Sequence, residues 1–217
     1  EVIGKHSPLL IGTQEGYYSM LEDIRSRLPE YEWIGSGRNG GDKGEHSAIL
    51  YKRDLLQVEE HGQFWLSEQP EEPGSIGWDG THSRICTWAR FRSKLQPQLQ
   101  LYVYNTHLDH IGQQAREQGI AQICRTIRAH HELHKLPFLL TGDFNAEPDN
   151  PAIRYLQTEQ SDLIRECMPN GGPDEGTFHD YKGGSDCPLI DYIFASTDVQ
   201  VEDSVIIRGQ VNGKYPS

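Results

Sequence analysis

An acidic and an amide side chain follow an apolar segment of the chain. Asp143 and Asn145 lie in the tetrapeptide Gly142-Asp143-Phe144-Asn145, directly after the apolar run Phe138–Thr141. Because side chains alternate along a strand, both are expected to point the same way from the end of a buried strand. Asp143 can then act as the base that holds an attacking water, and Asn145 can donate to a phosphate. An Asx turn at the strand end accounts for these two residues equally well.

Three other predicted strands deliver side chains that suit phosphoester hydrolysis. Glu15 follows Leu9–Thr13, His107 follows Leu99–Val103, and Asp191 lies inside an apolar run. Mg²⁺ prefers one or two carboxylates with water and substrate oxygens, so Glu15 is the candidate ligand for Mg²⁺, with Mn²⁺ as a substitute. His107 can bind a phosphate oxygen as a cation if an acid raises its proton affinity. Asp191 is expected to be buried and to need a partner. A solvated glutamate, a structural histidine and a structural salt bridge are the alternatives.

The composition limits the class of protein. The chain has 217 residues, of which 35% are hydrophobic, as expected for a single domain over residues 1–217. A net charge of −12 argues against tight, sequence-independent binding of nucleic acid, although bound cations can reverse the local field. No run approaches the ~20 apolar residues of a membrane span. The four cysteines are widely spaced and are expected to be reduced, which with the lack of a secretory signal predicts a cytoplasmic protein.

Strand patterns outnumber helix patterns along the chain. Helices are predicted at Tyr17–Leu28, Ile111–Leu133 and Pro151–Leu156, and a Gly-rich loop at 35–44. Strands are predicted at Leu9–Thr13, Glu32–Ser36, Ser47–Tyr51, Leu55–Phe64, Ile85–Phe91, Gln98–Asn105, Phe138–Thr141, Ile190–Ala195 and Val199–Ile207. So few helices cannot supply the crossovers of a doubly wound parallel sheet. A mixed two-sheet sandwich with helices outside fits better.

An ordered set of short motifs carries a family resemblance. The motifs are Thr13-Gln14-Glu15, Gly44-Glu45, Ser83-Arg84, Asn105-Thr106-His107-Leu108-Asp109, Gly142-Asp143-Phe144-Asn145 and Ile190-Asp191-Tyr192-Ile193. Together they resemble the endonuclease/exonuclease/phosphatase superfamily, which has the fold of deoxyribonuclease I. The stretch from Phe64-Trp65-Leu66-Ser67 to Gly77-Trp78-Asp79 resembles a bacterial branch of that superfamily with mostly unassigned substrates.

The resemblance implies a fold and a set of roles. The fold is a four-layer α/β sandwich, in which two mixed β-sheets pack face to face with helices on the outside. The resemblance assigns Glu15 to Mg²⁺, Asp143 and Asn145 to the water and the phosphate, and His107 to a phosphate oxygen.

Three further residues receive roles from the resemblance alone. It pairs Glu45 with His107, places Arg84 near the phosphate, and makes His179 a substrate contact through Thr177-Phe178-His179. From the sequence itself, Glu45 is an ordinary loop carboxylate and Arg84 forms a surface salt bridge.

The chain departs from the family pattern at both ends. The family begins with a strand that carries an asparagine of the metal centre, and it ends with a Ser-Asp-His motif and a core strand. Neither is found between Glu1 and Ser217, and the missing histidine would pair with Asp191. We therefore expect a domain without its first and last strands, which by itself is catalytically crippled.

The leading functional hypothesis is a Mg²⁺-dependent phosphoesterase that hydrolyses a phosphodiester or a phosphomonoester with an activated water. The acidic composition and the acidic, Trp-containing loop Glu68–Asp79 favour a small, non-polymeric phosphoester. A metal-dependent nuclease acting on DNA or RNA is an alternative. A non-catalytic binding module that retains the fold, or a carboxylate network without metal, is another. We expect a monomer without a protein partner.

Overall fold

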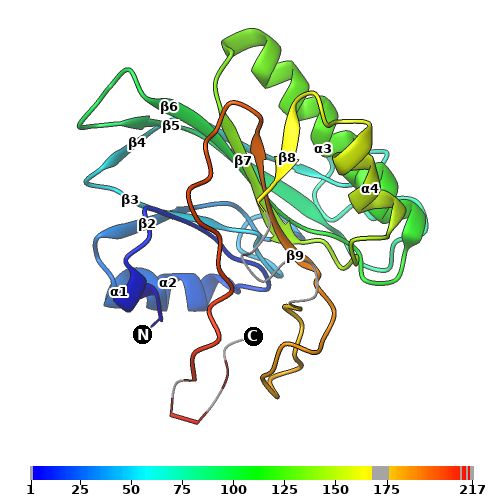
Figure 1. The fold of residues 1–217 in the computed structure, drawn as a ribbon, viewed down its shortest axis with the longest axis horizontal. Coiled ribbons are helices and arrows are strands. Elements are labelled where there is room, and N and C mark those ends of the chain that lie inside the picture. Colours follow the sequence, from blue (N-terminus) through cyan, green and yellow to red (C-terminus); the bar gives the residue numbers. More distant parts are fainter. Residues whose placement is uncertain (1, 168–175, 211, 214, 216–217) are drawn as a thin grey trace.

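The structure is a computed structural model that describes residues 2–167, 176–210, 212–213 and 215. It contains a three-stranded and a six-stranded sheet together with four helices (Figure 1). The smaller sheet has the order β1-β3-β2 and is antiparallel throughout. Its strands are β1 (Leu10–Gly12), β2 (Tyr31–Ile34) and β3 (Ile49–Lys52).

The larger sheet has the order β4-β5-β6-β7-β9-β8. Its strands are β4 (Leu56–Trp65), β5 (Ile85–Ser93), β6 (Gln100–His107), β7 (Phe138–Asp143), β8 (Ile164–Glu166) and β9 (Asp191–Ser196). Strands β6 and β7 are parallel, because the long helix α3 (Gln113–His134) connects them, and the other pairs are antiparallel. The ends of β6 and β7 therefore meet at one edge, where β9 begins.

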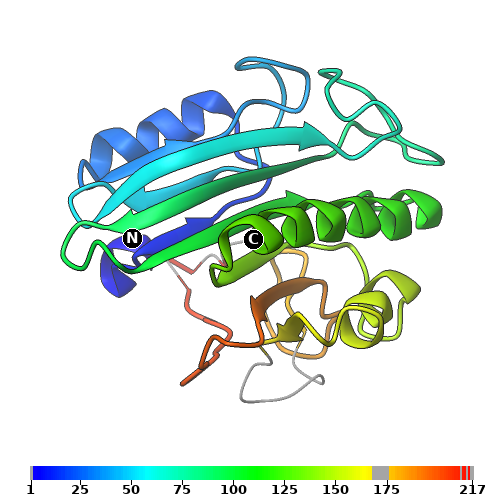
Figure 2. The same ribbon diagram turned by 90° about the horizontal axis from the view of Figure 1, so that it is seen from above.

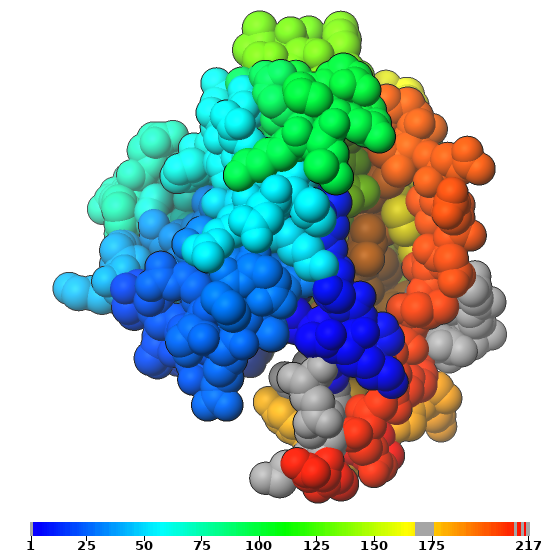
Figure 3. Space-filling view, turned by 90° about the vertical axis from the view of Figure 1, so that its left-hand side faces the viewer, coloured from blue at the N-terminus to red at the C-terminus, as the bar shows by residue number. Residues whose placement is uncertain are grey.

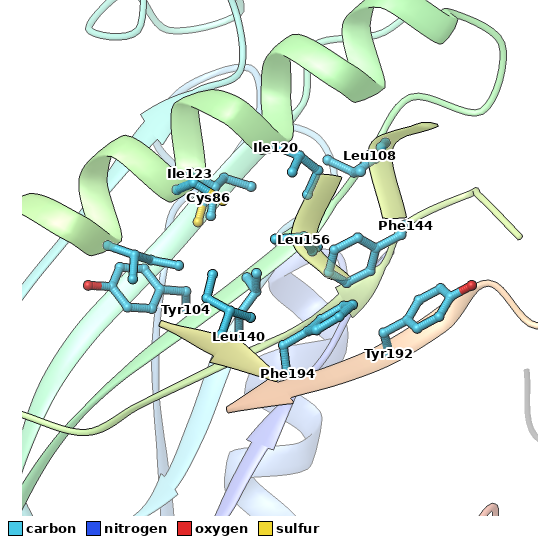
Figure 4. Packing of buried hydrophobic residues seen from close by; sticks show 14 of the residues in the cluster. Cys86, Tyr104, Leu108, Ile120, Ile123, Leu140, Phe144, Leu156, Tyr192 and Phe194 are labelled. Atoms are coloured by element: carbon cyan, nitrogen blue, oxygen red, sulfur yellow. The ribbon is translucent and has the colours of Figure 1, made fainter. Parts of the chain in front are cut away.

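The helices lie against different sheets (Figure 2). Leu21 of α2 (Tyr18–Arg27) is buried in a cluster with Tyr31 and Leu50 of the smaller sheet. Helices α3 and α4 (Pro151–Thr158) share the largest apolar cluster with the six-stranded sheet, and Figure 4 shows Ile120 and Ile123 of α3 and Leu156 of α4 facing that sheet. The remaining helix is α1 (Val2–His6), and none of the described helices is long and apolar enough to span a membrane.

A separate apolar cluster joins the two sheets. Ile34 and Ile49 of the smaller sheet pack with Ala89, Phe91 and Val103 of the larger one. Beside this contact lies a largely apolar cavity of about 470 Å³, bounded by β1 and by residues 204–206. Figure 3 shows the opening between the N-terminal segment in blue and the C-terminal segment in orange.

The α/β class with two sheets and few helices confirms the prediction, while the four-layer sandwich remains an interpretation. The expectation of two mixed sheets is wrong, since only the larger sheet contains a parallel pair. The expected strand Val199–Ile207 is also wrong: β7 and β8 occupy both edges of β9, and the segment forms no strand. The cysteines are free thiols, as expected.

Candidate active site

Three of the predicted residues form one row across neighbouring strands. His107 at the end of β6 is the register partner of Asp143 at the end of β7, and Asp143 is the partner of Asp191 at the start of β9. Directly opposed residues project from the same face of a sheet. The register therefore brings together an imidazole and two carboxylates from distant parts of the sequence.

Glu15 reaches the same place from the other sheet. It shares a cavity of about 160 Å³ with Asp143, Asp191 and His179. Glu15 is exposed and has a φ of 58°, a left-handed conformation that is uncommon for a residue with a side chain. The next residue is held in place, because the backbone N–H of His46 donates to the carbonyl oxygen of Gly16 at 2.8 Å.

A buried asparagine that received no role from the sequence fixes the segment before Glu15. Asn105 is 0% exposed, and its Nδ2 donates to the carbonyl oxygens of Thr13 (2.9 Å) and Ala48 (3.0 Å). Its Oδ1 accepts from Gln14 Nε2 (2.8 Å) and Thr141 Oγ1 (2.9 Å). One amide thus connects both sheets behind the site. The sequence signal was an asparagine inside an apolar strand, two residues before the candidate histidine.

Burial sets the protonation of the central pair. Asp143 Oδ2 lies 3.4 Å from His107 Nε2. Burial, followed by the charge of Asp191, raises the pKa of Asp143 to about 7. Burial, followed by the charges of Arg84 and Arg38, lowers the pKa of His107 to about 3. His107 is therefore neutral near pH 7. The condition for a cationic role, an acid that raises its proton affinity, is not met, because desolvation and two guanidinium groups outweigh the charge of Asp109.

The Asx turn that was the alternative interpretation of Asp143 and Asn145 is present at the end of β7. The backbone N–H of Asn145 donates to Asp143 Oδ1 at 2.8 Å, and Asn145 has a φ of 46°. Asn145 Nδ2 donates to the carbonyl oxygen of Leu108 at 3.0 Å, which orients the amide. An amide nitrogen has two hydrogens, so one is left for a ligand. The turn and the predicted phosphate contact are thus compatible.

Arginines, not His107, are the partners of Glu45. Glu45 Oε2 lies 2.7 Å from Arg38 Nη1 and 4.0 Å from Arg84 Nη1. Within the described part of the chain, Glu45 makes no ion pair or hydrogen bond with His107, so the pairing implied by the resemblance is wrong. The backbone N–H of Arg38 donates to the carbonyl oxygen of Glu45 at 2.9 Å across the Gly-rich loop. This hydrogen bond brings the two side chains next to each other.

Arg84 is a buried cation that lacks a complete set of partners. Its side chain is 9% exposed, so the expectation of a surface salt bridge is wrong. Its Nε has no hydrogen-bond partner in the described structure, and its ion pair with Glu45 is long. Burial and the neighbouring Arg38 lower its pKa, yet an arginine remains charged. Such a group is suited to an anionic ligand such as phosphate.

Asp191 and His179 line the same cavity. Asp191 is exposed and forms no ion pair among the described residues, so the expected burial and the alternative of a structural salt bridge are both wrong. Its carboxyl group does have a partner, the Thr177 side chain. Its backbone N–H donates to Thr177 Oγ1 at 3.1 Å, because β9 begins at this point instead of passing through the core. His179 Nδ1 is buried without a hydrogen-bond partner, as a ligand-facing ring can be.

A second group of polar residues lies beside Arg84. The ligand atoms of His82, Asp109 and His110 lie within 4.8 Å of one another, a spacing that a metal ion can bridge. Asp109, however, is 2% exposed and already accepts four backbone N–H groups: those of Thr81 (3.0 Å), His82 (3.1 Å), Ile111 (2.9 Å) and Gly112 (2.7 Å). The carboxylate thereby holds the loop before β5 against the start of α3.

The candidate metal site is the acidic cluster of Glu15, Asp143 and Asp191. Carboxylate oxygens are the ligands that Mg²⁺ prefers, and the adjoining cavity leaves room for water and substrate oxygens. Converging acids without a cation repel one another, and the charges of Asp191 and Glu15 add to burial, the larger cause, in raising the pKa of Asp143. The donor set therefore fits a divalent cation, with Glu15 as the predicted direct ligand.

Fold and site together define a phosphoesterase-like α/β protein, and comparison with known proteins identifies its family. Residues 1–212 match the Endonuclease/Exonuclease/phosphatase family, so the chain belongs to that family and is a phosphoric ester hydrolase. No significant match was found among curated protein sequences.

Solved structures give the same result. A mannosyl-6-phosphatase from Bacteroides thetaiotaomicron is 31% identical, with a TM-score of 0.89 over 99% of this chain and 83% of that chain. A second Bacteroides thetaiotaomicron protein, described as an endonuclease/exonuclease/phosphatase family protein, is 34% identical (TM-score 0.83; 90% and 72% of the chains). A functionally unknown conserved protein from Enterococcus faecalis is 29% identical (TM-score 0.85; 100% and 84%).

Proposed function

We propose that this protein is a Mg²⁺-dependent phosphomonoesterase that acts on a small sugar phosphate. The observation that carries the proposal is the pairing of a carboxylate cluster with a buried arginine. Asp143, Asp191 and Glu15 share one cavity, and the charge of Arg84 acts on Asp143. Hydrolysis of a phosphate ester needs both features, a base for water and positive charge for the phosphate oxygens. The four-layer sandwich is the scaffold that we infer for this site.

The residues divide the reaction between them. Asp143 in its ionised form accepts a proton from the attacking water, and neutral His107 orients that carboxylate. Arg84 binds a phosphate oxygen, and Glu45 positions Arg84 and Arg38. Mg²⁺, when bound at Glu15, supplies further positive charge at the phosphate.

The type of ester follows from charge and similarity. A negatively charged chain is a poor match for a polyanionic nucleic acid, whose binding relies on many Lys and Arg contacts. The similar Bacteroides thetaiotaomicron structure is described as a mannosyl-6-phosphatase. Both observations favour a small monoester over a polymer.

Phosphate release tests the proposal. Mannose 6-phosphate and bis(p-nitrophenyl) phosphate are compared with Mg²⁺ and with EDTA. We expect Mg²⁺-dependent release from the monoester and at least a hundredfold loss in Arg84→Gln, about the effect of removing one transition-state donor. Arg27→Gln is the control, because Arg27 is 76% exposed on α2. Faster hydrolysis of the diester, or full activity in a folded Arg84→Gln protein, would contradict the proposal.

A further inference from the structure

Two exposed histidines lie next to the buried Arg84. His110 Nδ1 is 3.5 Å from Arg84 Nη2, and the ring centroids of His82 and His110 are 5.2 Å apart. His110 lies three residues after His107, the last residue of β6, which places the pair close to the row of site residues. No step in the hydrolysis described above uses either ring.

The hydrogen bonds around Asp109 determine which nitrogen of His82 carries the proton. Thr81 Oγ1 lies 3.3 Å from Asp109 Oδ2 and 2.9 Å from His82 Nδ1. An ionised carboxylate only accepts, so both contacts are hydrogen bonds only if the Thr81 hydroxyl donates to Asp109 and accepts from His82 Nδ1–H. The reverse arrangement would set oxygen lone pairs against each other. Neutral His82 therefore presents an unprotonated Nε2, which is an acceptor.

Arg84 determines which nitrogen of His110 carries the proton, and the result is the opposite of that for His82. A guanidinium only donates, so His110 Nδ1 accepts from Arg84. The proton of neutral His110 is consequently on Nε2, which is a donor. Neither Nε2 has another hydrogen-bond partner within the described ranges. The pair thus offers one acceptor and one donor side by side.

A hydroxyl group matches this pair best, because it both donates and accepts. An anion would satisfy only the donor. A metal ion would need Asp109, whose oxygens already accept four backbone N–H groups, and it would lie close to the Arg84 cation. A leaving group with several hydroxyls could engage both rings while its phosphate occupies Arg84.

We propose that His82 and His110 bind hydroxyl groups of the leaving group and select polyhydroxylated phosphate esters over simple ones. This inference rests on the proposed function and narrows its substrate class. Both histidines act on specificity, and His110 in addition contacts Arg84 of the hydrolytic site.

The test compares a hydroxylated with a non-hydroxylated substrate. The constant kcat/KM is measured for mannose 6-phosphate and p-nitrophenyl phosphate in wild type, His82→Phe and His110→Phe. Loss of a hydrogen bond to substrate should lower kcat/KM on mannose 6-phosphate about tenfold in each variant. The constant for p-nitrophenyl phosphate should change less than about twofold in His82→Phe. In His110→Phe it should also fall, because Arg84 loses its acceptor, but by less than the constant for mannose 6-phosphate. His61→Phe is the matched control, since His61 is also exposed but lies on β4.

Equal losses on both substrates, or none on either, would overturn the inference. If wild type hydrolyses neither ester, the proposed function fails, and thermal shifts decide the inference separately. A larger shift with mannose 6-phosphate than with inorganic phosphate, absent in His82→Phe, would support hydroxyl binding. Equal shifts would refute it.

Discussion

Replacement of Asp109 by asparagine tests how the loop before β5 is held beside the site. The Asp109 carboxylate accepts four backbone N–H groups, two on each oxygen. Asparagine keeps one acceptor oxygen but turns an NH₂ group toward the other two donors. Each buried donor left without a partner costs ~1 to 3 kcal/mol, so Asp109→Asn should lower the free energy of unfolding by ~4 kcal/mol at pH 7.

The same variant gives a pH test with a defined sign. Although burial acts to raise it, the pKa of Asp109 is well below its ordinary 3.8, because backbone N–H groups from Gly112, Ile111, Thr81 and His82 stabilise the carboxylate. A carboxyl group whose pKa is lower in the folded than in the unfolded protein stabilises the fold at pH values above its unfolded pKa. This stabilisation is lost as the pH falls from the unfolded pKa toward the folded pKa. Between pH 7 and pH 3 the free energy of unfolding of wild type should fall by about 1 kcal/mol through Asp109, and that of Asp109→Asn should not. The difference in free energy of unfolding between the two proteins therefore narrows to ~3 kcal/mol at pH 3.

Urea unfolding of both proteins at pH 7, 4 and 3 measures these quantities. The reasoning is refuted if the free energy of unfolding of Asp109→Asn at pH 7 lies within about 1 kcal/mol of the wild-type value, which is the effect of an ordinary substitution. It is equally refuted if the difference widens as the pH falls. Asp54→Asn is the matched control, because Asp54 is exposed in the turn between β3 and β4 and the same substitution there should leave the free energy of unfolding unchanged.

Three further predictions concern the remaining supports of the site. Asn105→Ala should lower the free energy of unfolding by ~3 kcal/mol, because four buried hydrogen bonds are lost, and it should weaken Mg²⁺ binding in a calorimetric titration. Gly12→Ala should cost ~2 kcal/mol in thermal unfolding, since its Cβ would lie 2.4 Å from Thr141 Oγ1, whereas Gly209→Ala, with nothing within 4 Å, should be neutral. In EDTA, Asp143→Asn should stabilise the fold by ~1 to 2 kcal/mol above pH 7 and lose that gain as the pH falls toward 3.8; an unchanged urea midpoint would contradict the raised pKa.

The sequence predicted the elements that carry the site because their patterns are local. The apolar run before Asp143 and the alternating strand before His107 require only period-two burial, and both strands are present as β7 and β6. Their parallel pairing follows from the long intervening helix. Convergence of the polar residues at one sheet edge was therefore predictable.

Pairings and charges at the site depend on tertiary contacts and were not predictable. The neutral state of His107 results from burial and from Arg84 on a neighbouring segment, neither of which its own sequence neighbourhood reveals. Glu45 pairs with Arg38 because the Gly-rich loop folds back on itself. Val199–Ile207 has an alternating pattern, but a strand also needs a free edge to pair with, and β9 offers none.

The most direct test of the account is hydrolysis of mannose 6-phosphate in ¹⁸O-labelled water with Mg²⁺, in wild type and in Asp143→Asn. The account predicts that wild type releases phosphate carrying one labelled oxygen, because the water held by Asp143 attacks phosphorus. It predicts that Asp143→Asn releases almost none, although it remains folded. Label in the sugar product, or undiminished release by Asp143→Asn, would contradict the central claim that this row of residues activates water for attack on a phosphate ester.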